Sequence, residues 1–142
     1  MGRSRGGFST KIHALVDTQG RPLHVELTPG QQHESTVAES IIRGYGRGKA
    51  LIADTGYDSD AIRECVEECG MQAVIHPNPT RRTELRLDRR KYRRRYLVEC
   101  FFHHLKRFRC LATRFEKTAR HYLALVHLAC TVIWLQELLP QR

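Results

Sequence analysis

A single carboxylate, Asp54, directly follows a short apolar run at residues 50–53. A continuous apolar run of this length is typical of a strand that is buried on both faces. Because ligands of open α/β sheets bind beyond the carboxyl ends of their strands, an acid at this position is well placed to hold a metal ion. Asp54 taken alone is equally consistent with a second interpretation, in which its carboxylate caps the turn that follows.

Four further residues that could do chemistry recur at helical spacing: Tyr92, Arg95, Glu99 and Lys106. On an α-helix with about 100° per residue, their side chains fall within one narrow stripe. The large apolar residues of the segment lie on the other side, so the stripe is not the core face. One acid among bases suits metal-dependent phosphoryl transfer, because the acid holds the ion and the bases hold phosphates. The alternative, which the residues alone favour slightly, is a solvated basic face in which Glu99 pairs with Arg95.

Positive charge is concentrated just before and within this segment. The chain has 24 Lys and Arg against 15 Asp and Glu, a formal net charge of +9, which favours a polyanionic partner. Much of the excess lies at 80–95, and its central members are Arg89, Arg90, Arg93 and Arg94. The charge alone does not single out nucleic acid, because a ribosome, a membrane surface or solubility would also account for it. We expect this run to contact phosphates, because cationic clusters drive sequence-independent affinity for nucleic acid. The alternative is a solvated loop.

Alternating hydrophobicity near the start of the chain predicts a β-hairpin with strands at 8–16 and 22–28. Apolar residues at helical spacing then predict a short helix that begins at Ser35 or Thr36. His33 lies just before this helix and is a candidate to face the same edge of the sheet as Asp54. A hydrogen-bonded structural role for His33 is equally consistent with its position.

The strand that precedes Asp54 belongs to a larger predicted unit. Asp58 or Ser59 is placed to cap a following helix, whose apolar residues recur at helical spacing. A second apolar run at 73–75 comes next and is stopped by prolines. Strand, helix and strand over so short a distance predict a βαβ unit with two parallel strands.

Two longer helices are predicted in the second half of the chain, at about 89–109 and about 117–138. The first carries the stripe that contains Glu99. The second includes a stretch without formal charge at 121–136, which is short for a membrane-spanning segment. We therefore interpret it as a buried core helix.

Cysteine usage and the first residues bear on localisation. The five cysteines are odd in number and show no CxxC spacing, which favours reduced thiols over a zinc site or a disulfide framework. The first ten residues are basic and Gly-rich, with no apolar segment typical of a secretory signal. We therefore expect a cytoplasmic protein.

Two blocks of the sequence resemble insertion-sequence DDE transposases. ADTGYDSDAI at 53–62 is similar to the sequence around the second catalytic Asp of that family, and the spacing Tyr92-x2-Arg95-x3-Glu99-x6-Lys106 matches its Tyr-Arg-Glu-Lys signature. The stretches GRSRGGFSTKIHALVDTQGRPL, GQQHEST and HHLKRFRCLATRFEK resemble the large branch named after insertion sequence five. The resemblance extends from about residue 2 to residue 136.

The resemblance implies a fold and a site. The implied fold is α/β and ribonuclease-H-like, with a mixed sheet and flanking helices. Asp54 and Glu99 resemble the second and third acids of the catalytic triad, which would bind two divalent ions, Mg²⁺ or Mn²⁺. Tyr92, Arg95 and Lys106 resemble the residues that flank this Glu, and Lys106 is expected to contact transposon-end DNA.

The same resemblance suggests partners and a cellular setting. Transposon ends and target would both be double-stranded DNA, the active assembly would be a homo-oligomer, and no membrane would be involved. A bacterial-type, nucleoid-associated protein is expected. A His often stands in the family at the position of His33, which makes this residue an accessory candidate for the site.

One departure from the family pattern concerns the first catalytic Asp, which the family places on a strand upstream of the hairpin. Asp17 is the sole acid before residue 26, and it lies in the hairpin turn. We therefore expect residues 1–142 to be a partial catalytic domain, truncated or split between reading frames. It would lack the first strand and the amino-terminal DNA-binding region and be inactive alone. The alternative function is a non-catalytic basic DNA-binding module.

Overall fold

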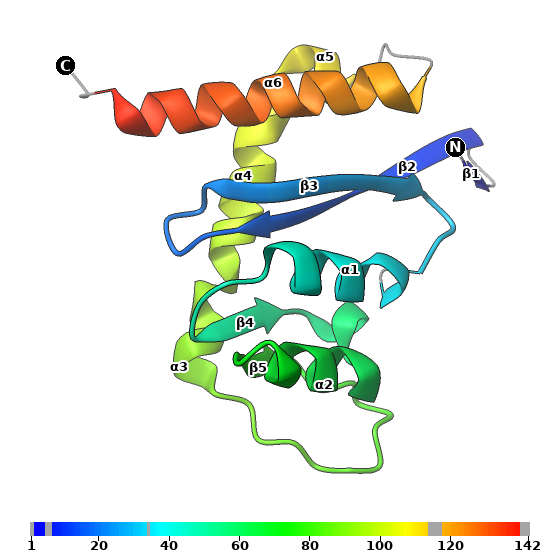
Figure 1. The fold of residues 1–142 in the computed structure, drawn as a ribbon. Helices are drawn as coiled ribbons and strands as arrows, with labels where there is room; N and C mark the ends of the chain where they lie inside the picture. The colour runs from blue at the N-terminus through cyan, green and yellow to red at the C-terminus, as the bar shows by residue number, and fades with distance from the viewer. Residues whose placement is uncertain (1, 5–6, 34, 114–117, 140–142) are drawn as a thin grey trace. The chain divides into compact units, whose positions relative to one another are not determined.

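The computed structural model describes residues 2–4, 7–33, 35–113 and 118–139. The chain divides into two compact units (Figure 1). The first unit comprises Met1–Gln32 and Leu97–Arg142, and the second comprises His33–Tyr96. Each unit has its own hydrophobic core, so each is described by itself.

The first unit begins with the predicted hairpin. Strands β2 (Gly7–Val16) and β3 (Pro22–Pro29) pair antiparallel. Asp17 closes the turn between them, because its carboxylate accepts hydrogen bonds from the backbone N–H of Gln19 and from the backbone and side chain of Arg21. A short strand, β1 (Gly2–Ser4), adds to β2. Its residues Gly2, Arg3 and Ser4 carry no hydrophobic alternation, so the sequence did not predict it.

Helices from the carboxyl-terminal half complete the first unit. They are α4 (Tyr96–Lys106), α5 (Arg109–Ala112) and α6 (Ala119–Leu138). The core joins strand β3 to all three helices through Val25, Phe101, Leu105, Leu111, Tyr122, Val126, Ala129 and Ile133. One face of α6 therefore belongs to the core, as predicted, whereas Leu128, Leu135 and Leu138 of the same helix are exposed rather than buried. Among the described residues, no helix has both the length and the apolar character needed to cross a membrane.

Trp134 fastens α6 to the hairpin of the same unit. Its indole Nε1 donates a hydrogen bond of 2.8 Å to the carbonyl oxygen of Pro22. The guanidinium of Arg21 lies 4.4 Å from the centre of the indole ring, which is within range of a cation–π contact. The aromatic side chain thus has structural partners on both its polar atom and its face.

The second unit contains the predicted βαβ arrangement. Its elements are α1 (Ser35–Tyr45), β4 (Ala50–Ala53), the 3₁₀ helix η1 (Thr55–Tyr57), α2 (Asp60–Glu68) and β5 (Gln72–Ile75). Strands β4 and β5 are parallel, with Ala53 opposite Ile75. Ser59 caps α2, because its hydroxyl accepts from the backbone N–H of Ile62. The residues of β4 are half-buried rather than fully buried, since β5 is its only paired neighbour among the described strands.

The predicted helix at 89–109 is not continuous. It divides into α3 (Arg89–Tyr92), a 3₁₀ turn η2 (Arg93–Arg95) and α4, which ends at Lys106. Like charges at i and i+4 destabilise an α-helix, and Arg89 with Arg93 is such a pair. A 3₁₀ turn has about 3.0 residues per turn, so the uniform α-helix from which the stripe of Tyr92, Arg95, Glu99 and Lys106 was predicted is interrupted at Arg93–Arg95.

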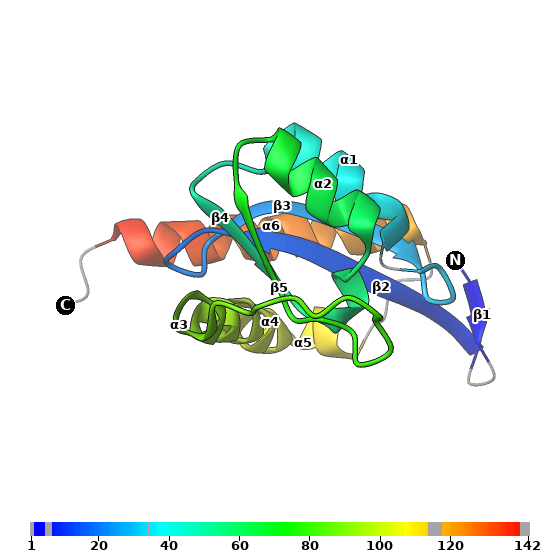
Figure 2. The ribbon, with the colours of Figure 1, turned by 90° about the horizontal axis from the view of Figure 1, so that it is seen from below.

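The strands form two separate sheets among the described residues. Strands β1, β2 and β3 make an antiparallel sheet, and β4 and β5 make a parallel one (Figures 1 and 2). The expectation of an α/β protein with both kinds of pairing is confirmed. The expectation of one mixed sheet differs from the structure, in which no described strand joins the two sheets.

Candidate active site at the carboxyl edge of the parallel strands

Asp54 lies at the carboxyl end of β4 and is exposed to solvent. It is also the N-cap of η1, because its Oδ1 accepts a hydrogen bond of 3.1 Å from the backbone N–H of Gly56. Both interpretations of this residue therefore describe the same side chain. Among the described residues, no hydrogen bond to Oδ2 is formed, so this oxygen can bind a ligand from solution.

His76 follows β5 at the level of Asp54. Its backbone N–H donates to the carbonyl oxygen of Ala53 at 3.3 Å, which extends the parallel ladder by one step. Its Nδ1 lies 3.3 Å from the hydroxyl of Thr55 and 3.0 Å from the carbonyl oxygen of Pro77. We did not single out His76 from the sequence. Its place directly after the second parallel strand was the signal, because the carboxyl ends of parallel strands share one edge.

Tyr92 reaches the same edge from α3. Helix α3 packs against both β4 and β5, and η2 packs against β4. The Tyr92 ring lies 5.5 Å from the His76 ring, with an angle of 53° between the ring planes. The structure therefore brings Tyr92 to the edge that carries Asp54, with His76 between them. Arg95, at the end of η2, is half-buried.

The central arginines of the basic run remain accessible. Arg89, Arg90, Arg93 and Arg94 are all exposed on α3 and η2. The neighbouring Lys91 instead bonds to the side-chain oxygen of Gln72 and forms an ion pair with Asp88. The exposed arginines leave a row of positive charge available to a partner.

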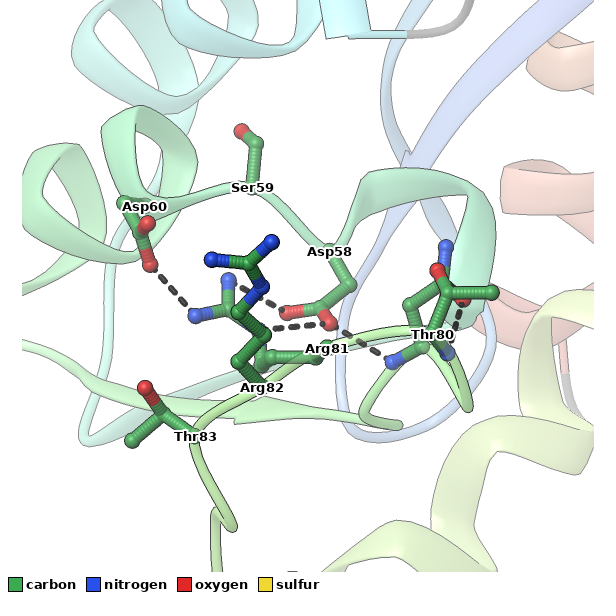
Figure 3. Close-up of a pocket in the computed structure, with 8 residues that line it drawn as sticks. Asp58, Ser59, Asp60, Thr80, Arg81, Arg82 and Thr83 are labelled. Atoms are coloured by element: carbon green, nitrogen blue, oxygen red, sulfur yellow. Dashed lines mark hydrogen bonds and ion pairs between the residues drawn. The ribbon is translucent and has the colours of Figure 1, made fainter.

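Arg81 corrects one part of the sequence interpretation. It belongs to the basic run, but its side chain is only 15% exposed and is paired with Asp58 and Asp60 of the same unit. Figure 3 shows its guanidinium between the two carboxylates. Its charge is therefore neutralised within the unit, and Arg81 stabilises the loop after β5 rather than contacting a phosphate.

Asp58 is the centre of this ion-pair cluster. Its side chain has 0% exposure and accepts hydrogen bonds from Nε of Arg63 at 2.7 Å, Nε of Arg81 at 3.1 Å and the backbone N–H of Asn78 at 2.7 Å. Burial alone would raise the pKa of this carboxyl. The hydrogen bonds from Asn78, Arg63 and Arg81 outweigh burial and hold the pKa of Asp58 below its usual value.

An open hollow of about 400 Å³ lies over the cluster (Figure 3). Its lining residues are Asp58, Ser59, Asp60, Asn78, Thr80, Arg81, Arg82 and Thr83. The two acids in the lining are matched by arginines, so the hollow has no strong excess of either charge. The cluster holds the loop after β5 against the start of α2.

Glu99 and Lys106 belong to the first unit, on α4. Both are exposed, whereas Phe101 and Leu105 of the same helix are buried in the core. The prediction that these two polar residues avoid the core face is confirmed. The approach of Glu99 to Asp54, which lies in the second unit, stays a prediction.

His33 has a local partner. Its Nδ1 lies 2.8 Å from the hydroxyl of Ser35 and 3.4 Å from the backbone nitrogen of that residue. The side chain therefore takes part in the turn that begins α1. This contact supports the structural interpretation of His33, and its accessory role in the site stays a prediction.

Comparison with known proteins identifies the class of this chain. It belongs to the DDE transposases, because the transposase DDE domain matches residues 2–134. A transposase of insertion sequence element IS6501 from Brucella ovis is 41% identical over 130 residues, which cover 91% of this chain and 100% of that protein.

Two further relatives are longer than the region they share with this chain. A transposase of insertion sequence element IS402 from Burkholderia cepacia is 33% identical over 92% of this chain and 64% of that protein. The transposase of IS1106 from Neisseria meningitidis serogroup B is 31% identical over 68% of this chain and 35% of that protein. No solved structure matches the chain.

Proposed function

We propose that this chain forms part of the catalytic site of a DDE transposase of the branch named after insertion sequence five. The site would cut and join DNA strands during transposition. One observation supports this proposal above the others. Asp54 ends a parallel strand at the edge that Tyr92, a member of the Tyr-Arg-Glu-Lys signature, reaches through His76.

Asp54 and Glu99 are the proposed metal ligands. Both are exposed carboxylates, and oxygen donors of this type suit Mg²⁺ or Mn²⁺. Among the described residues, no group of three or more His, Cys, Asp or Glu side chains is arranged to hold a metal, so these two acids would need further ligands to hold the ions. When bound, two ions would polarise the attacking and the leaving oxygen of the phosphodiester.

The basic residues would hold the DNA. Arg95 and Lys106 would bind phosphates beside Glu99, and the exposed arginines at 89–94 would add contacts that do not depend on sequence. His33 is the proposed accessory residue. The substrates would be double-stranded DNA, both at the transposon ends and at the target. The active assembly would be a homo-oligomer. It would be associated with the nucleoid in a bacterial cytoplasm.

A third carboxylate would complete the site. Asp17 is not available for it, because the backbone of Gln19 and Arg21 and the Arg21 side chain already occupy its oxygens. We propose that a third acid completes the ligand set, and that the fold around the complete site is ribonuclease-H-like.

The second candidate function is a basic DNA-binding module without catalysis. It is favoured by the exposure of Arg89, Arg90, Arg93 and Arg94. The two functions differ in whether Asp54 and Glu99 share a metal ion. That difference can be measured without an activity assay.

Metal-directed cleavage of the polypeptide tests the proposal. Fe²⁺ with ascorbate and peroxide generates hydroxyl radicals at a divalent-metal site, and these cut the nearby backbone. For the full chain we expect cuts beside both Asp54 and Glu99, suppressed by excess Mg²⁺. Asp54→Asn should remove both sets of cuts, because each ion in a shared site depends on both carboxylates.

Glu64→Gln is the matched control, since Glu64 is an exposed carboxylate on α2 outside the proposed site. It should leave the cutting pattern unchanged. Cuts beside only one of the two acids, or a pattern that survives Asp54→Asn, would exclude a shared metal site and leave the non-catalytic module as the better function.

A further inference from the structure

His76 touches two parts of the second unit that the sequence separates. On one side its Nδ1 lies 3.3 Å from the hydroxyl of Thr55, the residue after Asp54. On the other side its ring contacts the ring of Tyr92, with 5.5 Å between the centroids. The loop that carries the Asp54 carboxylate and the helix that begins the signature segment are therefore joined through one imidazole.

The contacts of Nδ1 define which nitrogen carries the proton. The carbonyl oxygen of Pro77 lies 3.0 Å from Nδ1, and a carbonyl oxygen can only accept a hydrogen bond. We therefore assign the proton to Nδ1, and in this assignment the Thr55 hydroxyl at 3.3 Å accepts from the same N–H. In this tautomer the ring is fixed in orientation by two acceptors, one on each strand end.

We propose that His76 is a positioning residue of the catalytic edge. Its Nδ1–H holds the Asp54 loop through Thr55, and its ring holds Tyr92. The inference rests on the proposed function in one respect: positioning of the Asp54 loop affects metal affinity only if Asp54 is a metal ligand. The coupling between Thr55, His76 and Tyr92 is a separate claim that can be tested without metal.

Partners that orient a metal ligand affect metal affinity although they do not touch the ion. Asp54 accepts a hydrogen bond from the N–H of Gly56 within the loop that Thr55 begins. Release of Thr55 from His76 would let this loop, and with it the carboxylate, adopt other orientations. We therefore expect His76→Ala to weaken Mn²⁺ binding about tenfold.

Four variants of the full chain separate the two contacts of His76. His76→Ala removes both, His76→Asn keeps an N–H donor but lacks the ring, and Tyr92→Leu removes the aromatic partner. The control is His127→Ala, an exposed residue of α6 in the first unit. Because His76 and His127 are exposed and Tyr92 is only half-buried, the fold should persist in each variant, and circular dichroism checks it.

NMR spectra of the metal-free chain test whether Thr55, His76 and Tyr92 are coupled. The ¹⁵N-histidine spectrum above pH 7.5 should show His76 protonated at Nδ1. His76→Ala should shift both the Gly56 amide and the Tyr92 ring signals. His76→Asn should restore the Gly56 amide but not the Tyr92 ring, and His127→Ala should change neither. An Nε2–H tautomer, or Tyr92 signals that do not move in His76→Ala, would overturn the proposal.

A double-mutant cycle on Mn²⁺ affinity tests the consequence. If His76 and Tyr92 act as one unit, the double variant His76→Ala with Tyr92→Leu should bind Mn²⁺ no more weakly than His76→Ala alone. Losses that multiply would show independent roles and contradict the inference. Mn²⁺ binding that Asp54→Asn leaves unchanged would instead refute the metal site of the proposed function, and the metal-free NMR result would still decide the role of His76.

Discussion

Three aspartates of this chain show how the surroundings of a carboxylate separate structural from chemical roles. Asp17 and Asp58 each accept several hydrogen bonds from arginine side chains and backbone N–H groups, and each has a lowered pKa. Asp54 is exposed, and among the described residues only the N–H of Gly56 donates to it. An acid that keeps an oxygen accessible to solvent can bind an ion, whereas the acids saturated by the protein stabilise loops.

Asp58→Asn should destabilise the second unit. The variant removes the charge that Arg63 and Arg81 surround in a fully buried position, and loss of one partner from a buried ion pair costs about 3 kcal/mol. Urea unfolding followed by circular dichroism measures the loss in free energy of unfolding. Asp60→Asn is the control, because Asp60 is 77% exposed and exposed ion pairs contribute at most about 1 kcal/mol. Equal effects of the two substitutions would contradict the central role of Asp58.

The contribution of Asp58 should also depend on pH. Its pKa is lowered in the folded chain, because the hydrogen bonds from Asn78, Arg63 and Arg81 outweigh the opposing effect of burial. A lowered folded pKa gives stability that is complete above the unfolded value of about 3.9 and is lost as the pH falls through the folded value. The stability difference between the wild type and Asp58→Asn should therefore be constant from pH 5 to 7 and shrink below pH 4. A difference that grows on acidification would refute this assignment.

At the scale of elements, local patterns predicted the hairpin and the βαβ unit correctly. Their periodicity and turn residues act within a few positions, so one sequence contains the necessary information. The 3₁₀ turn at Arg93–Arg95, which packs against β4, was missed because no local pattern distinguishes it from the α-helical spacing on either side. The pairing of Arg81 with Asp58 and the contact of His76 with Tyr92 join residues far apart in sequence, and no local pattern marks such contacts.

The segment formed by α3 and η2 should bind duplex DNA in a salt-dependent and nearly sequence-blind manner. Each phosphate contact adds about 0.9 to the slope of log affinity against log salt. The test variant changes to alanine the four exposed arginines Arg89, Arg90, Arg93 and Arg94. It should flatten the slope by about 0.9 for each arginine that contacts a phosphate. Fluorescence anisotropy across a salt series measures the slope.

A control with the same change in net charge separates position from total charge. It replaces with alanine four exposed basic residues from other elements: Arg43, Arg47, Lys49 and Arg120. We expect this control to retain most of the slope. An equal loss in both variants would mean that net charge, not the arginine run, drives DNA binding.

At the scale of the whole molecule, each compact unit has its own core and supplies one proposed carboxylate. Asp54 comes from the unit built around β4 and β5, and Glu99 comes from the unit built around the hairpin and α6. The sequence could not predict this division, because it arises from which residues share a core.

Residues 1–142 alone, with Mg²⁺ or Mn²⁺, should cut transposon-end DNA at no more than the background rate. Two divalent ions close together repel each other strongly, and the ligands must supply enough negative charge to offset that repulsion. Asp54 and Glu99 supply two charges, and the signature residues Arg95 and Lys106 bring positive charge to the same proposed site.

Addition of a strand-forming segment that carries an acid should restore cleavage, and Glu99→Gln in the restored assembly should return it to background. The control is Glu64→Gln, which should retain cleavage. If residues 1–142 alone nick DNA robustly and Glu99→Gln abolishes this activity, an acid within these residues completes the site. Glu26 would then be the first residue to test, because the oxygens of Asp17 already accept hydrogen bonds within the hairpin turn.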